Sequence, residues 1–339
     1  MSFELFAETT RNDIVESYHF GAAAIADCYG QISHQWGDVE QLVFPRSALK
    51  PFYAIDLVES GAADHFKLSD VELALSCASH LGQTMHSEAV SEWLIRLGLN
   101  VTDLACGSVL PDDEQHMIDV LAKGQGKCSI HHNCSGKHAG FLTYSMHKGY
   151  DLTNYHQITH PAQQNSLDIL SNLADMDIRQ SPMGIDGCGF PAPTMPLAEL
   201  AYAVAGFANP VNLSTSRAKA VYRLHNAMAK EPYFVSGHGN AISDIMHITN
   251  GKILVKSGAE GIMTAAIPTL GLGIAIKIAD GSARARTAVL FAILDQLNIL
   301  TSFEKQRLQK HLKPKISNSR HEIVGEIRPT IRNIEWQSS

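Results

Sequence analysis

The residues with the clearest chemical potential are a serine and a lysine spaced three apart, Ser47 and Lys50. A serine hydroxyl is a weak nucleophile at neutral pH and needs a base beside it. On a helix, residues i and i+3 have Cβ atoms roughly 5–6 Å apart, so the amine of Lys50 could take the hydroxyl proton. Pro51 places Ser47 at or just before the helix N-terminus, because a proline ring clashes with the carbonyl four residues back. The unpaired N–H groups at that end would stabilise an oxyanion next to the hydroxyl.

A second motif, late in the chain, strengthens this interpretation. Alone, S-x-x-K is a weak signal, because a serine N-cap followed by a surface lysine has the same spacing. Lys256-Ser257-Gly258 ends the apolar run 253–255, which is typical of a strand. S-x-x-K with a later K-[ST]-G on a strand resembles the pattern of penicillin-recognising serine hydrolases. The two motifs in this order predict acyl transfer or amide hydrolysis by a serine.

Such a device needs a second hydroxyl, which passes a proton to the leaving amine. Ser79 is the candidate, with Lys256 beside it to bias the transfer. His86 follows on the same segment and is a candidate to face the same cleft. The alternative is a helix C-terminus at residues 76–82 whose polar side chains only cap carbonyls.

The densest polar cluster is residues 131–138, which hold three histidines, a cysteine and a lysine. Cys188, in the glycine-rich stretch 184–189, is a possible partner for Cys134. Two thiolates with a histidine would suit zinc. The spacing matches no standard zinc pattern, so buried structural cysteines are an equally open alternative.

Composition is that of an ordinary globular protein. The 339 residues are 45% apolar and 18% charged, enough for one large domain or two lobes. A net charge of −7 without a basic run argues against a nucleic-acid partner. No stretch reaches the ~20 apolar residues that span a bilayer, and the N-terminus does not read as a signal peptide. We therefore expect a cytoplasmic protein with no membrane partner, whose six cysteines stay reduced.

Helical periodicity dominates the middle of the chain, and strands are expected at both ends. A capping box, Ser69 with Glu72, starts one helix. The other predicted helices are 87–97, 114–122, 137–147, 161–174, 197–207, 214–229 and 284–297. The predicted strands are 19–27, 31–36, 252–255, 261–267, 272–279 and 323–331.

This order predicts an α/β (α+β) fold in which one sheet is assembled from both chain ends and a helical lobe is inserted. We expect residues 1–60 with 250–339 to form the α/β lobe and residues 61–249 the mainly helical lobe. Together they would make a single compact catalytic unit. Ser47 would lie at the junction, where pockets tend to form.

Five ordered blocks together resemble the rhizobial-type L-asparaginase family, also called asparaginase II. The blocks are Arg46–Pro51, Ser76–His80, Asn133–His138, Gly184–Gly189 and Lys256–Gly261. The resemblance implies a fold akin to serine β-lactamases and glutaminases. It implies hydrolysis of L-asparagine to aspartate and ammonia through two pairs, Ser47 with Lys50 and Ser79 with Lys256.

The resemblance also implies a zinc ion held by Cys134, Lys137 and Cys188, in place of the histidine expected from the residues alone. A lysine ligand must bind without its proton. Whether the zinc acts on the substrate or braces two loops stays open. Arg46 and Asp186 are implied at the substrate, as partners for the α-carboxylate and the α-ammonium, and family members resemble homodimers.

Two positions depart from the family pattern. Tyr53 stands where a glutamine is expected, and Gln83 where an acidic residue is frequent. Both bear on affinity and specificity. Two other functions therefore stay open: a glutaminase or another amidase on the same device, and a zinc-dependent amino-acid-binding protein without turnover.

Overall fold

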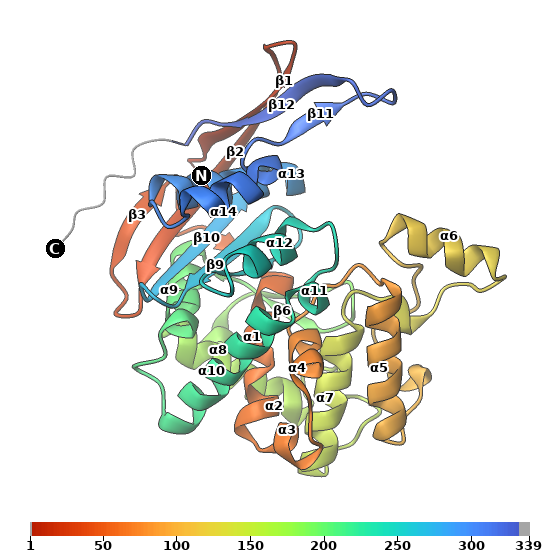
Figure 1. Ribbon diagram of the computed structural model, residues 1–339. Coiled ribbons are helices and arrows are strands. Elements are labelled where there is room, and N and C mark those ends of the chain that lie inside the picture. The colour runs from red at the N-terminus through yellow and green to blue at the C-terminus, as the bar shows by residue number, and fades with distance from the viewer. Residues whose placement is uncertain (1, 332–339) are drawn as a thin grey trace. The chain divides into compact units, whose positions relative to one another are not determined.

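Strands from the two ends of the chain pair side by side in one antiparallel sheet (Figure 1). The computed structural model describes residues 2–331. Within them the sheet runs in the order β11-β12-β1-β2-β10-β9-β8, with β3 also paired to β2. The strands are β1 (Glu4–Arg11), β2 (Ile14–Asp27), β3 (Ile32–Trp36), β8 (Leu254–Ser257), β9 (Ile262–Ile267), β10 (Leu272–Ile278), β11 (Lys315–Ser317) and β12 (Ile323–Pro329).

The described chain divides into two compact units. The sheet unit comprises residues 2–48, 195–209 and 255–331, and the helical unit comprises residues 49–194 and 210–254. The helical unit is thus inserted between the strands of the sheet unit along the chain. This arrangement confirms the predicted α/β class with a sheet built from both chain ends.

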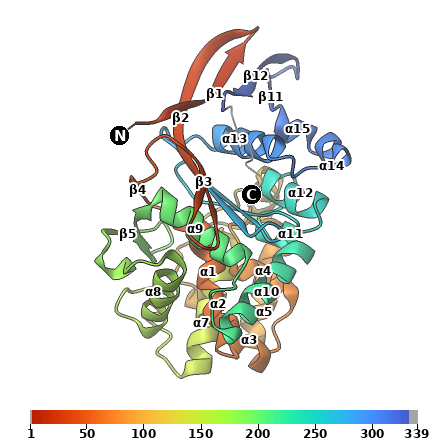
Figure 2. The ribbon, with the colours of Figure 1, turned by 90° about the vertical axis from the view of Figure 1, so that its left-hand side faces the viewer.

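The sheet unit is covered on both faces, because strand β9 is buried at every position and β10 at all but one. Helix α9 (Leu197–Ala208) packs on β2, β9 and β10. Helix α13 (Ala283–Gln296) packs on β1, β9, β10 and β12. The short helices α14 (Ser302–Arg307) and α15 (Gln309–Leu312) lie beside α13 (Figure 2).

The helical unit is built around α4 (Asp70–Ser76), which packs on α7 (Ser135–Lys148) and α10 (Thr215–Lys230). Gly136 permits the first contact, because a Cβ there would lie 2.4 Å from the carbonyl oxygen of Leu75. The other helices are α1 (Lys50–Tyr53), α2 (Ile55–Glu59), α3 (Ala62–His65), α5 (Thr84–Arg96), α6 (Glu114–Ala122), α8 (Pro161–Ala174), α11 (Pro232–Val235) and α12 (Ala241–Ile248). No helix among residues 2–331 combines the length and apolar character needed to cross a bilayer.

The predicted helices and strands are confirmed, most with ends shifted by one to a few residues. The capping box at Ser69 and Glu72 is present in full. Strand β1, helix α12 and several short elements, among them β11, α11, α14 and α15, were not predicted.

The helix expected after Ser47 is broken into three short pieces: the 3-10 helix η1 (Arg46–Leu49), α1 and α2. Ser47 is the second residue of η1, so it does lie at the start of a helical segment as predicted. The segment is short, and its few residues align few peptide dipoles, so the expected dipole field at Ser47 is weak.

The two units differ from the expected lobes at three places. Residues 49–60 and 250–254 belong to the helical unit, and residues 195–209 belong to the sheet unit. The placement of residues 195–209 has a clear cause. Helix α9 is apolar around most of its circumference, with nine of its twelve residues buried, and it packs on the sheet.

Candidate active site

The predicted site residues fall into two sets, one in each unit. The sheet unit holds Arg46, Ser47 and Lys256, and the unit boundary follows Ala48. The helical unit holds the remaining predicted residues: Lys50, Ser79, His86, Cys134, Lys137, Asp186 and Cys188.

In the sheet unit, Ser47 and the Lys256-Ser257-Gly258 motif lie close together. A Cβ at Gly258 would stand 2.3 Å from the carbonyl oxygen of Pro45, so only glycine lets the end of β8 approach this closely. Arg46 adopts a left-handed conformation, with φ of 51°, directly before Ser47. Such a conformation costs a non-glycine residue of order 1–3 kcal/mol and is found preferentially at functional sites.

The lysine of this motif is well held. Lys256 is 3% exposed, and its Nζ donates to the carbonyl oxygen of Ser257 at 3.0 Å. Its own carbonyl oxygen accepts from Thr264 Oγ1 at 3.0 Å. Arg286 donates to the carbonyl oxygen of Gly258, which anchors the turn after β8.

In the helical unit, Lys50 forms a hydrogen bond with Ser79. The buried Nζ of Lys50 lies 2.8 Å from Ser79 Oγ and donates to the carbonyl oxygens of Ala78 at 2.6 Å and Asn133 at 3.3 Å. These three oxygens match the three donors of an ammonium group. The sequence did not predict this contact. The pairing of Ser79 with Lys256 stays a prediction.

Ser79 does not cap the preceding helix. Helix α4 ends at Ser76, and residues 78–83 have no regular secondary structure. The backbone N–H of Ser79 donates to the carbonyl oxygen of Val235, and that of Leu81 to Ser236. The segment is therefore held by its neighbours, which directs the Ser79 hydroxyl to Lys50.

Two stacked histidines lie beside this segment. His80 Nδ1 accepts from the N–H of Gly82, so its Nε2 carries the proton and donates to Ser135 Oγ at 2.9 Å. Burial lowers the pKa of His80 well below its usual value, and repulsion from the protonated forms of His86 and Lys50 adds to this effect.

His86 is fully buried and stacks on His80, with ring centroids 4.7 Å apart. Its Nε2 donates to the carbonyl oxygen of Tyr233 at 2.9 Å. Burial lowers the pKa of His86 to about 4, so both rings are neutral at pH 7. The contacts of His86 support the His80 ring, and a contact with substrate stays a prediction.

The residues of the expected zinc site come together. Lys137 Nζ donates to Cys188 Sγ at 3.0 Å and lies 3.6 Å above the ring of Phe190. A hydrogen bond joins the thiols of Cys134 and Cys188. This bond, together with the nearby cations Lys50 and Lys137, lowers the pKa of Cys134 well below its usual value. The direction of this shift favours the thiolate form of Cys134, whose Sγ also lies 3.1 Å from Asn133 Oδ1.

Two local structures bring these side chains together. Cys134 and Lys137 lie at the start of α7, where Gly136 contacts α4. Cys188 lies in the loop between β5 (Met183–Ile185) and β6 (Pro191–Pro193). Asp186 closes this loop, because its N–H donates to the carbonyl oxygen of Phe190 and its carboxylate accepts from the N–H of Gly187.

The donor set fits zinc, although it is not the set expected from the residues alone. Residues 2–331 contain no group of three histidine, cysteine, aspartate or glutamate side chains that could hold a metal ion. The third donor at the two sulfurs is the amine of Lys137. Two thiolates and one nitrogen are donors that zinc accepts.

A buried histidine beside this cluster has an unsatisfied nitrogen. The Nδ1 of His138 pairs with the Tyr155 hydroxyl at 2.6 Å, and that hydroxyl accepts from the N–H of Ala105. The tyrosine proton therefore points to Nδ1, which leaves the proton of His138 on Nε2. No hydrogen bond of ordinary geometry reaches the buried Nε2 among residues 2–331. Burial lowers the pKa of His138 to about 3, and the nearby Cys188 thiol acts against this shift, so the ring interacts with the cluster.

The two positions that depart from the family pattern are placed differently. Tyr53 packs edge-on against Phe141, and its pKa is raised by burial and then by the charges of Asp186 and Cys188. It therefore lies beside the cluster. Gln83 bridges Asp113 and the backbone of His238.

Several functional contacts have no signature in the sequence. The partners of Lys50 include two backbone carbonyls, those of Ala78 and Asn133, and any residue type can supply a carbonyl. The only sequence signal was the position of Asn133 inside the polar cluster 131–138.

The model of one family, L-asparaginase II, matches residues 7–329. The chain belongs to the L-asparaginase II family. A comparison with curated proteins finds no match.

Two of the solved structures that resemble this L-asparaginase II family member are described here by their sequence identity and TM-score. The native form of the protein called Mglu is 17% identical, with a TM-score of 0.45 over 83% of this chain and 65% of that chain. A β-lactamase from Mycobacterium bovis is 14% identical, with a TM-score of 0.40 over 81% of this chain and 94% of that chain. The chain thus spans less than two thirds of the Mglu chain. Both TM-scores are low, and no functional conclusion rests on them.

Proposed function

We propose that this protein hydrolyses the side-chain amide of L-asparagine to L-aspartate and ammonia through an acyl-enzyme on Ser47. The observation that supports the chemistry most is the hydrogen bond between the buried amine of Lys50 and Ser79 Oγ at 2.8 Å. Family membership supports the reaction class. The strained backbone at Arg46, directly before Ser47, supports the nucleophile.

The proposed steps use the two hydroxyls in turn. Ser47 Oγ attacks the amide carbon, and an uncharged Lys50 accepts the hydroxyl proton. The proton passes from Lys50 through Ser79 to the amide nitrogen, the C–N bond breaks, and ammonia leaves. Water then attacks the aspartyl ester and returns a proton to Ser47. Lys256 is proposed to act on Ser79 in the transfer step.

Recognition of a free amino acid requires a partner for each of its charged groups. We assign Arg46 to the α-carboxylate and Asp186 to the α-ammonium. Arg46 directly precedes the nucleophile, and Asp186 lies close enough to Lys137 to raise the pKa of that lysine. His86 completes the assignment as a residue that holds the segment of Ser79 in place.

We further propose that Cys134, Lys137 and Cys188 hold a zinc ion. The contact between Lys137 and Cys188 and the hydrogen bond between the two thiols support this set. A zinc ion bound there would supply a Lewis acid or a fixed link between the start of α7 and the loop at Cys188. The family also suggests a homodimer, which light scattering would test, and a cytoplasmic location stays a prediction.

Ser47→Ala tests the reaction directly. We expect this variant to lose asparagine turnover, measured as ammonia release, and to retain asparagine binding in calorimetry. Ser257→Ala, in the later motif, is the matched control and should keep more activity. Retained turnover in Ser47→Ala would remove Ser47 as nucleophile.

A substrate panel separates the alternatives. Faster ammonia release from glutamine than from asparagine would make the protein a glutaminase on the same device. Hydrolysis of nitrocefin would extend the activity to β-lactams. Asparagine binding with no turnover of any amide by the wild type would identify a binding protein.

A further inference from the structure

The turn after β8 contains the last residue of the Lys256-Ser257-Gly258 motif and leads into β9. The N–H of Gly258 donates to the carbonyl oxygen of Ile262 at 3.0 Å, which closes the turn. Gly258 also lies so close to the carbonyl oxygen of Pro45 that a Cβ on it would stand 2.3 Å away. Pro45 precedes Ser47 by two residues. The position of this one glycine therefore affects how the motif lies against the segment of Ser47.

Two cations from other elements of the sheet unit hold the carbonyl oxygens of this turn. Arg286, on α13, donates through Nη1 to the carbonyl oxygen of Gly258. Lys277, on β10, donates to the carbonyl oxygen of Glu260 at 2.5 Å. Hydrogen bonds from charged donors are stronger than those between neutral groups, so both contacts fix the turn. Of the two, only Arg286 acts on the glycine that faces Pro45.

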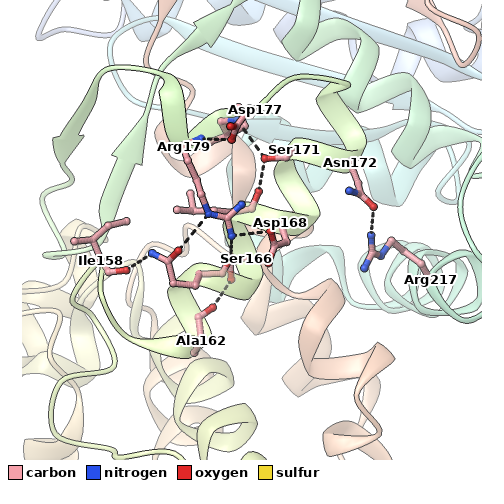
Figure 3. Close-up of polar contacts among 12 residues, drawn as sticks. Ile158, Ala162, Ser166, Asp168, Ser171, Asn172, Asp177, Arg179 and Arg217 are labelled. Carbon is pink, nitrogen blue, oxygen red and sulfur yellow. Dashed lines mark hydrogen bonds and ion pairs between the residues drawn. The ribbon is translucent and has the colours of Figure 1, made fainter.

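Arg286 lacks the carboxylate partner that other arginines of the chain have. In the helical unit, for example, Arg179 forms an ion pair with Asp168 at 2.6 Å (Figure 3). Among residues 2–331, Arg286 forms no such pair, and its Nε is buried without a hydrogen-bond partner. Burial lowers the pKa of Arg286, and no carboxylate of the described chain acts against this shift. The guanidinium therefore loses hydration without gaining a counter-charge.

The place of Arg286 on its helix adds to this cost. Arg286 is the fourth residue of α13, and the first turn of this helix holds no acidic residue. The positive end of a helix dipole disfavours a cation. A buried charge without a partner is destabilising, and an apolar side chain of similar length would avoid that cost. Stability gives no reason for an arginine here, whereas residues retained at a cost to stability are characteristic of functional sites.

We propose that Arg286 is a positioning residue for hydrolysis at Ser47, an inference that rests on the function proposed above. Its guanidinium holds the carbonyl oxygen of Gly258 and thereby keeps the motif at the end of β8 in place against Pro45. This task needs no contact between Arg286 and the substrate, because it acts through the backbone of Gly258. A displacement of about 1 Å at such a motif is enough to slow a reaction about a hundredfold.

Arg286→Met tests the assignment, because it keeps an unbranched side chain and removes every hydrogen-bond donor. We expect kcat for ammonia release from asparagine to fall about tenfold or more. KM should change less than about threefold, because no group assigned to bind substrate is removed. The melting temperature should equal that of the wild type or exceed it by about 1–3 °C. Arg284→Met, which changes an exposed arginine of the same helix, is the matched control and should leave kcat and the melting temperature unchanged.

Arg286→Lys separates positioning from general distortion. A lysine keeps a charged donor for the carbonyl oxygen of Gly258, so this variant should recover most of the lost kcat. Should Arg286→Met not fold, Arg286→Gln takes its place and should have a lower kcat than Arg286→Lys. A wild-type kcat in the apolar or the glutamine variant, or a loss that Arg286→Lys does not recover, would overturn the assignment alone. Absence of turnover in the wild type would refute the proposed function, and this assignment with it, before any variant is compared.

Discussion

Two lysines of the helical unit are buried to almost the same degree but differ in their hydrogen-bond partners. Lys50 is 1% exposed and Lys137 is 2% exposed. Lys50 forms hydrogen bonds with three oxygens: the hydroxyl of Ser79 and two backbone carbonyls. Lys137 instead donates to the sulfur of Cys188 and lies above an aromatic ring.

The difference shows what a buried amine can do in each place. Burial by itself lowers the pKa of Lys137, but the sulfurs of Cys188 and Cys134 outweigh burial and raise it. That amine is held as a cation until a metal displaces its proton. Lys50 also lies near Cys134 and lowers the pKa of that thiol, but it forms a hydrogen bond with the Ser79 hydroxyl as well, so it is better placed to exchange a proton with a serine.

The largest effect is expected at the oxygen-bound lysine. Lys50→Met should lower the rate of asparagine hydrolysis by about a thousandfold or more, because it removes the proposed base. Lys50→Arg should be equally inactive, because a guanidinium keeps its proton at any working pH. Ammonia release measures both. Substantial activity in Lys50→Arg would mean that Lys50 only positions its neighbours.

At the sulfur-bound lysine the main loss should be in stability and metal content. Lys137→Met leaves a buried thiolate without its cation, so we expect the free energy of unfolding to fall by about 3 kcal/mol in urea titrations.

Elemental analysis of the same protein should show that zinc is lost from Lys137→Met and kept in Cys106→Ala, a matched change at a buried cysteine outside the proposed set. A chelator should lower the stability of the wild type but not of Lys137→Met. Equal zinc in wild type and Lys137→Met would remove this lysine as a ligand.

A smaller effect is expected at the hydroxyl bonded to Lys50. Ser79→Ala should lower kcat about a hundredfold, because the leaving nitrogen loses its proton relay. Zinc content should stay unchanged, which separates the two lysine environments. Ser87→Ala, on α5, is the control and should keep normal kinetics. Normal turnover in Ser79→Ala would assign the relay to another group.

The smallest effect concerns the histidine stack beside Ser79. The folded-state pKa of His86, about 4, lies below the unfolded value of about 6.5, so unfolding takes up a proton between these values. This contribution to stability is complete above about pH 6.5 and is lost as the pH falls towards 4. By pH 5 the loss should reach about 2 kcal/mol.

His86→Phe should be less sensitive to acid than the wild type in urea unfolding at pH values on either side of 6. His65→Phe, at an exposed histidine of the same unit, is the control and should keep the acid sensitivity of the wild type. An unchanged loss of stability in His86→Phe would place the proton uptake elsewhere.

Much of the fold could be predicted because its signals are local. The apolar runs of β9 and β10 and the capping box at Ser69 identify these elements within a few residues of chain. Strand β1 could not be predicted in this way. It is held between β2 and β12, and its partner β12 lies at the opposite end of the chain.

Two further features also depend on neighbours distant in sequence. The sequence correctly predicted a helical segment near Ser47, but not its division into short pieces. It correctly predicted helix α9, but not that this helix packs in the sheet unit.

For the site, the amino-acid sequence by itself determined which reactive groups exist and how they are spaced: Ser47 with Lys50, Ser79, two cysteines and Lys137. Side-chain chemistry is a property of residue type, so these candidates follow from the printed sequence. Only the tertiary structure decided that Lys50 contacts Ser79 and that Lys137 contacts Cys188. These outcomes depend on backbone carbonyls, burial and close helix packing, which arise only when distant segments of the chain meet.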